Sequence, residues 1–145
     1  MPAAHAEDID VQLHEVESGG FHILPDAMNA QKGETLNLTV TNQGKIAHDL
    51  VVCGDGPVPP TDCQDVWGFI APLQAGQTAR LTATAKKAGT FTYYCSLPGH
   101  AAGGMRGTLT VQGDNGSSKP SPGTALVGTL MSLAVVAFLV RRERS

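Results

Sequence analysis

The chain has 145 residues, of which 41% are hydrophobic, and this suffices for one packed domain with attachments but not for two ordinary domains. Seventeen glycines and nine prolines indicate many turns and favour an all-β domain over a helical bundle. The final five residues carry three of the 10 basic side chains and one of the 13 acidic ones. The net charge of the chain before them is therefore about −5. Without a basic patch we expect no nucleic acid as a partner, and the acidic surface favours a basic protein instead.

Alternation of apolar and polar residues predicts the strands of the first half. Residues 9–16 place apolar side chains at alternate positions, residues 21–24 form a short extended run, and residues 36–40 alternate again. A further apolar run at residues 50–53 ends at a cysteine. Breaks that contain glycine separate most of these segments, as expected for loops between strands.

Three more segments predict strands in the second half. Residues 78–84 alternate after a turn, residues 90–95 follow another turn, and residues 107–111 form the last extended run. Turn residues at this spacing are typical of a β-sandwich with Greek-key connections. We therefore expect one all-β Greek-key sandwich over residues 9–112, preceded by a short tail at residues 1–8.

The C-terminal part predicts attachment to a membrane. Residues 113–123 have the composition of a flexible linker, and residues 124–140 carry no charge over 17 positions. At about 1.5 Å per residue this run reaches about 26 Å, the length of a short transmembrane helix. Arg141 and Arg142 begin a basic tail (residues 141–145) that the positive-inside rule places in the cytoplasm. We expect a single-pass protein of the cell membrane with its β domain on the extracytoplasmic face.

Other interpretations of the two ends remain open. Small residues at 121–123 before an apolar run and a basic tail also resemble a prokaryotic C-terminal sorting signal, which is cleaved near such a motif. A buried core helix is a third interpretation, although the run is apolar on all sides. At the N-terminus, Ala4–His5–Ala6 followed by acidic residues resembles the remnant of a cleaved export signal.

The three cysteines divide into a pair and a single residue. Cys53 and Cys63 flank a turn-rich loop, whereas Cys95 lies in a different setting. We expect a Cys53–Cys63 disulfide, which would place the domain in an oxidising compartment. The alternative is that both residues are buried free thiols.

A single loop carries three side chains that bind soft metals. Cys95, His100 and Met105 have the spacing C-x4-H-x4-M between two predicted strands, and His48 begins an extended run upstream. Two histidines and one cysteine in a trigonal arrangement, with a weak axial methionine, form the ligand set of blue copper sites. Such a set accommodates Cu(I) and Cu(II) with little change of geometry, which suits single-electron transfer.

With these residues the chain resembles the cupredoxins, or type 1 blue copper proteins. Its loop spacing is similar to that of auracyanins, sulfocyanins and rusticyanins, and plastocyanins have a shorter interval between cysteine and histidine. The resemblance covers residues 20–112. The motifs that support it are Gly33–Glu34, Asn42, His48–Asp49, Gly76, Gly89–Thr90, Tyr94–Cys95 and Pro98–Gly99–His100.

The resemblance implies a role for each ligand. Cys95 would be the equatorial thiolate, His48 and His100 the equatorial imidazoles, and Met105 the axial thioether. The cofactor would be one copper ion, with cytochromes or a terminal oxidase as redox partners. Asp49 stands where asparagine is commoner in the family.

The resemblance also implies surfaces for electron transfer. His100 would be the ligand at the solvent edge, surrounded by a flat apolar docking patch. Tyr94 would point away from copper and mark a second electron-transfer surface, although it could equally be a merely exposed aromatic. The residues expected at these surfaces are Tyr94, Pro98, Gly99, Ala101 and Ala102.

Three other functions compete with an electron carrier. A copper enzyme needs further ligands, typically His-x-His pairs, and the sequence contains none, so we expect no enzyme. A copper-storage or delivery protein usually relies on methionine-rich or multi-histidine sites, and the chain has four methionines. An adhesive β-sandwich with one disulfide accounts for the fold but leaves the Cys–His–Met loop unexplained.

Overall fold

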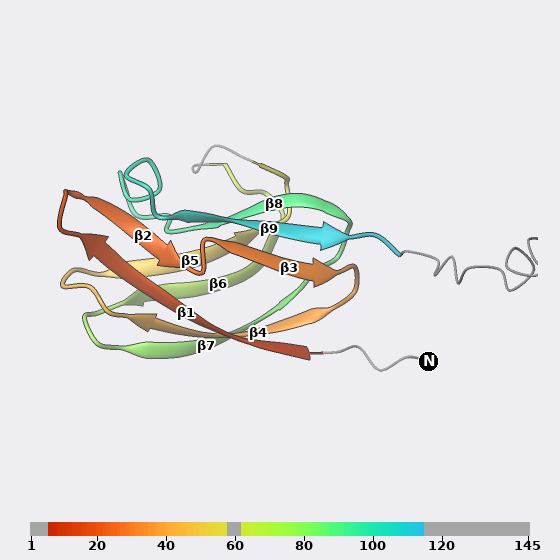
Figure 1. The fold of residues 1–145 in the computed structure, drawn as a ribbon, viewed down its shortest axis with the longest axis horizontal. Coiled ribbons are helices and arrows are strands. Elements are labelled where there is room, and N and C mark those ends of the chain that lie inside the picture. The colour runs from red at the N-terminus through yellow and green to blue at the C-terminus, as the bar shows by residue number, and fades with distance from the viewer. Residues whose placement is uncertain (1–5, 58–61, 115–145) are drawn as a thin grey trace, which may run out of the picture. The chain divides into compact units, whose positions relative to one another are not determined.

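The computed structural model describes residues 6–57 and 62–114, which form nine strands in two sheets (Figure 1). The first sheet has the order β2 (Gly20–Leu24), β1 (Ala6–Val16), β4 (Thr35–Asn42) and β7 (Thr78–Thr84). The second has the order β3 (Ala27–Gln31), β9 (Arg106–Gln112), β8 (Gly89–Tyr94), β5 (His48–Cys53) and β6 (Val66–Leu73). The predicted all-β sandwich is confirmed.

The core lies between the sheets and follows the alternation of the strands. β4 buries every second residue, so that Leu36, Leu38 and Val40 are each at most 1% exposed. β9 alternates in the same way, and its buried residues include Leu109. Full burial of such a side chain contributes about 1.5–3 kcal/mol, which makes the two sheets a firm support for the loops at their ends.

Two strands were not predicted. β3 joins the second sheet by parallel pairing with β9, in which Met28 lies opposite Leu109. β6 is an edge strand that pairs with β5, and it buries Trp67, Ile70 and Leu73 at intervals of three residues rather than two. Register shifts in the β5–β6 pair account for this interval, because a bulge turns the following side chains to the other face.

The predicted disulfide is present. Cys53 and Cys63 are bonded with their Cα atoms 5.8 Å apart, and Cys95 is a buried free thiol. The bridge belongs to a small apolar cluster that also contains Tyr94, which directly precedes Cys95, and Ala101, which lies within the Cys–His–Met loop. The disulfide therefore supports the same part of the domain that carries the candidate ligands.

Several predictions concern residues outside the described part of the chain. These are the signal remnant at Ala4–His5, the apolar run at residues 124–140, the basic tail at residues 141–145, and most of the linker. In residues 6–57 and 62–114 there is no helix with the length and apolar character needed to cross a membrane.

Candidate metal centre

The candidate ligands come from three elements that meet at one end of the sandwich. His48 is the first residue of β5, Cys95 directly follows β8, and Met105 directly precedes β9. The loop between Cys95 and Met105 is closed by backbone hydrogen bonds, because Cys95 N donates to Met105 O (3.1 Å) and Met105 N donates to His100 O (2.9 Å). The strand pairing of β8 with β9 thus sets the width of the loop.

Three donor groups converge as the sequence predicted. His48 Nδ1 lies 3.1 Å from His100 Nδ1, and the Cys95 Sγ lies 3.5 Å from the same atom of His100. All three donors are within 4.8 Å of one another. His48 and Cys95 are fully buried, and His100 is half-buried, so the group opens toward solvent only at His100.

The donor group fits one metal ion. An ion bonded to nitrogen at about 2.0–2.1 Å and to sulfur at about 2.3 Å, as zinc is, keeps its donors within about 4.4 Å of one another. The distances of 3.1 and 3.5 Å between the donor atoms satisfy this limit. A thiolate with two imidazoles suits copper in both oxidation states. Copper is therefore the ion that His48, Cys95 and His100 fit best.

Met105, the predicted fourth ligand, closes the loop directly before β9. Its side chain is fully buried in the main core cluster, which also contains Cys95. Its backbone is hydrogen-bonded to both Cys95 and His100. Met28, by contrast, is a buried core residue of β3 and is not part of the ligand loop. The role of Met105 as axial ligand stays a prediction.

Asp49 ties the two ligand-bearing segments together. Its carboxylate accepts hydrogen bonds from the backbone N–H and the hydroxyl of Ser96, both at 2.5 Å. Its own backbone N–H points at the Cys95 Sγ from 3.4 Å. A register shift between His48 and Leu50 lets consecutive residues of β5 be buried here. Asp49 thus bonds the segment that follows His48 to the segment that follows Cys95.

The electrostatics of the site favour neutral ligands before a metal binds. Burial raises the pKa of the Cys95 thiol to about 11, against the lowering effect of the backbone N–H groups of Asp49 and Leu97. Burial also lowers the pKa of His48, an effect that the nearby Glu15 carboxylate opposes. A metal ion that binds at neutral pH would therefore have to displace the thiol proton of Cys95.

Two residues of the β1–β2 hairpin contact the histidines, and neither was predicted. Glu15 and Phe21 are register partners in adjacent strands. The Phe21 ring stacks on His100 with a centroid distance of 4.1 Å, and Glu15 Oε1 lies 3.5 Å from His48 Nε2. No sequence spacing connects these residues to the ligand loop, because only the pairing of β1 with β2 brings them together.

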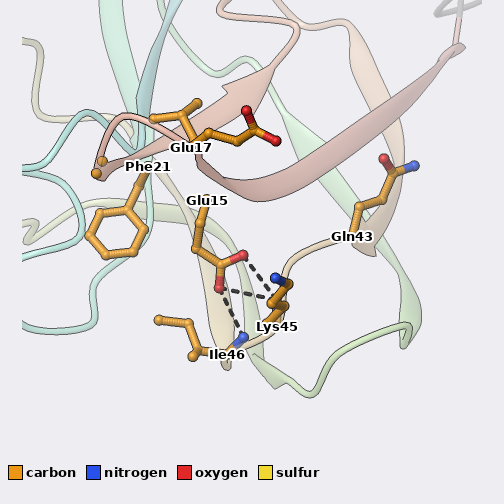
Figure 2. Close-up of a pocket in the computed structure, with 9 residues that line it drawn as sticks. Glu15, Glu17, Phe21, Gln43, Lys45 and Ile46 are labelled. Carbon is orange, nitrogen blue, oxygen red and sulfur yellow. Dashed lines mark hydrogen bonds between the residues drawn. The ribbon is translucent and has the colours of Figure 1, made fainter.

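The Glu15 carboxylate is fixed by the loop before β5. Figure 2 shows it directed at the backbone nitrogens of Lys45 and Ile46, which donate to its oxygens at 2.9–3.1 Å. Burial opposes ionisation of Glu15, but these hydrogen bonds outweigh it and lower the pKa to about 2. Glu15 is thus negatively charged at all ordinary pH values.

The predicted docking patch is only partly at the surface. Pro98, Gly99 and Ala102 are exposed beside His100, but Ala101 is 4% exposed. Tyr94 is 3% exposed, so both interpretations that place it at the surface are wrong. Tyr94 and Ala101 face the disulfide cluster, which covers them.

Comparison with known proteins agrees with this geometry. Residues 10–112 match the family of copper binding proteins described as the plastocyanin/azurin family. The chain belongs to that family. The family binds copper, and the group of His48, Cys95 and His100 is consistent with one type 1 copper ion in this plastocyanin/azurin-family protein.

Individual relatives are similar over different lengths. Auracyanin-B of Chloroflexus aurantiacus is 43% identical over 54 residues, which cover 37% of this chain and 23% of that protein. The chain thus spans less than a quarter of that relative in the alignment. The copper-resistant cuproprotein CopI of Pseudomonas aeruginosa is 25% identical over 136 residues, covering 68% of this chain and 75% of the relative.

The solved structures agree on the fold. An auracyanin from Roseiflexus castenholzii superimposes with a TM-score of 0.61 at 23% sequence identity. The match covers 72% of this plastocyanin/azurin-family chain and 96% of the auracyanin. The β-sandwich that positions the metal centre therefore has the same fold as this auracyanin.

Proposed function

We propose that this protein shuttles single electrons between redox proteins at the outer surface of a membrane. As a member of its family it is a copper-binding electron carrier and not an enzyme. The observation that carries the proposal is the convergence of one thiol and two imidazoles within 4.8 Å at the edge of a rigid sandwich. This donor set is suited to a metal that changes charge by one unit without rearranging its ligands.

Each residue of the centre has a separate task. Bound copper supplies the one-electron change. Cys95 and His48 are fully buried and fixed by β8 and β5, so their donor atoms keep their positions when the charge changes. Asp49 holds the segment after Cys95 through its two bonds to Ser96. A fixed geometry keeps the reorganisation cost of electron transfer small.

Electrons would pass through the half-buried edge of His100. Pro98, Gly99 and Ala102 surround this edge as exposed residues with small or apolar side chains. Such a surface allows the close approach of a partner with little polar surface to desolvate. The charge of about −5 outside the last five residues supports a basic partner, such as a cytochrome or a basic face of a terminal oxidase.

The proposed location combines two features of the chain. The Cys53–Cys63 disulfide supports an oxidising compartment. The uncharged residues 124–140, followed by Arg141 and Arg142, support a membrane segment with a cytoplasmic C-terminus. We propose that the copper domain lies on the extracytoplasmic face.

A second candidate function is binding or delivery of copper. The relative from Pseudomonas aeruginosa that aligns with 68% of this chain is named a copper-resistant cuproprotein. A protein of that kind would bind and release copper, whereas a carrier would retain it through many redox cycles. Retention of copper during repeated oxidation and reduction separates the two functions.

An anaerobic redox titration of the copper-loaded domain tests the proposal. We expect a reversible one-electron transition with no loss of copper over repeated cycles. Stopped-flow mixing with a basic and an acidic c-type cytochrome should give faster transfer to the basic one, and the difference should shrink as salt rises. Irreversible reduction, or release of copper on reduction, would favour delivery instead.

A further inference from the structure

One polar atom beside the metal centre lacks a hydrogen bond. His48 Nε2 is the buried side-chain nitrogen or oxygen without a hydrogen-bond partner in residues 6–57 and 62–114. His48 itself is fully buried. The Glu15 Oε1 lies 3.5 Å from this nitrogen, slightly beyond a normal hydrogen bond. Leaving a buried N–H unpaired is unfavourable, so a small approach of the two groups would stabilise the site.

Glu15 is built to approach His48 as a carboxylate. It lies near the end of β1 and accepts hydrogen bonds from the backbone of Lys45 and Ile46, in the loop that leads into β5 (Figure 2). These bonds fix the side chain against the same loop that delivers His48. Only 27% of the Glu15 side chain is exposed, so water competes weakly with His48 for hydrogen bonding to Oε1.

The contact decides which nitrogen of His48 carries the proton. A carboxylate can only accept a hydrogen bond, so it selects the form of His48 with a proton on Nε2. The Nδ1 lone pair then faces His100 Nδ1 at 3.1 Å and the Cys95 sulfur beyond it. This is the nitrogen that a metal ion in the donor group requires.

We propose that Glu15 is a positioning residue of the copper centre, which accepts the Nε2–H of His48 and thereby fixes the ring and its metal-facing nitrogen. Partners of this kind orient metal-bound histidines and raise their basicity. The negative charge also stabilises Cu(II) more than Cu(I), so Glu15 lowers the reduction potential. This inference rests on the proposed copper-binding function.

Glu15→Gln tests the proposal in the copper-loaded domain. The glutamine amide keeps the shape of the side chain and one oxygen that can accept hydrogen bonds from the backbone of Lys45 and Ile46, but it removes the negative charge. We expect Cu(II) affinity to fall about tenfold relative to Cu(I), which corresponds to a rise of 59 mV in the one-electron potential. The matched control is Glu17→Gln, because Glu17 is exposed and lines one surface pocket together with Glu15, two residues away (Figure 2). A purely structural role for Glu15 would lower stability and leave the potential equal to that of the control, and this result would overturn the proposal.

A second measurement needs no variant and no copper. Nitrogen-15 NMR of the metal-free wild-type protein should find the His48 proton on Nε2, in slow exchange with water. A proton on Nδ1 would overturn the proposal even if Glu15→Gln failed to fold. The two hypotheses fail differently: a wild-type protein that binds no copper would reject the proposed function, whereas equal potentials in a copper-loaded pair of variants would reject only the role of Glu15.

Discussion

Removing the Cys53–Cys63 disulfide should destabilise the domain strongly. The bridge closes a loop with a sequence separation of 10, for which the chain-entropy relation gives about 3 kcal/mol. The change to test is the double variant Cys53→Ala/Cys63→Ala, in metal-free protein so that copper does not add stability. Since the urea dependence of small domains is about 1–3 kcal/mol/M, the unfolding midpoint should fall by about 1–3 M.

The single tryptophan gives a convenient signal for this experiment. Trp67 is 6% exposed in the native core, so its fluorescence reports global unfolding. The control is Cys95→Ala, which removes another fully buried sulfur without breaking a bridge. Equal midpoints for the double variant and this control would refute the reasoning. Three reactive thiols in denatured wild-type protein, rather than one, would refute the disulfide itself.

Three further predictions concern the metal centre. Met105→Gln should keep copper but lower its reduction potential, because a harder axial oxygen stabilises Cu(II), and potentiometry that finds no change or a rise would reject Met105 as axial ligand. Asp49→Ala should lower the unfolding free energy by about 3 kcal/mol, because two hydrogen bonds from Ser96 are lost. Ser96→Ala removes only the hydroxyl bond, so a urea midpoint for Asp49→Ala equal to that of Ser96→Ala would contradict this prediction. Copper affinity should rise about tenfold per pH unit between pH 7 and 9, because the Cys95 thiol, with a pKa of about 11, must lose its proton when copper binds. Affinities measured by competition with a chelator should show this rise, and an affinity that does not change with pH would count against the prediction.

Most of the strands could be predicted because apolar and polar residues alternate along them. Leu36, Leu38 and Val40 alternate with polar residues, and the structure buries all three in β4. β3 was not predicted because its Ala and Asn residues have low strand propensity, and its stability comes from pairing with β9, which is distant in sequence. β6 escaped because Gly68 and Pro72 interrupt it and register shifts break its alternation. Proline is tolerated there because β6 is an edge strand.

In the metal centre, too, residues close together in the sequence could be predicted and residues brought together by the fold could not. Cys95, His100 and Met105 lie in one short loop, so their spacing in sequence already implies proximity. Glu15 and Phe21 lie far upstream, and their contacts with the histidines depend on the fold of the β1–β2 hairpin. Spacing predicts the ligands of such a site, whereas the residues that orient the ligands follow from three-dimensional structure.

The burial of Tyr94 has a similar origin. The resemblance to the cupredoxins implied that Tyr94 points away from copper and marks a surface. The disulfide and Ala101 cover that opposite face, so Tyr94 is buried on the far side of the sheet from the core. The resemblance thus implied the direction of the side chain, but the sequence did not specify which residues would cover it.

The central claim is that Cys95 and two histidines bind one redox-active copper ion. The most direct measurement combines metal analysis with visible spectra of the copper-loaded domain, oxidised and then reduced, for the wild type and Cys95→Ser. The wild type should bind one copper per chain and be intensely blue or green when oxidised and colourless when reduced, and Cys95→Ser should lack the colour in both states. An oxidised wild-type protein without intense colour, or with the same spectrum as Cys95→Ser, would contradict the account.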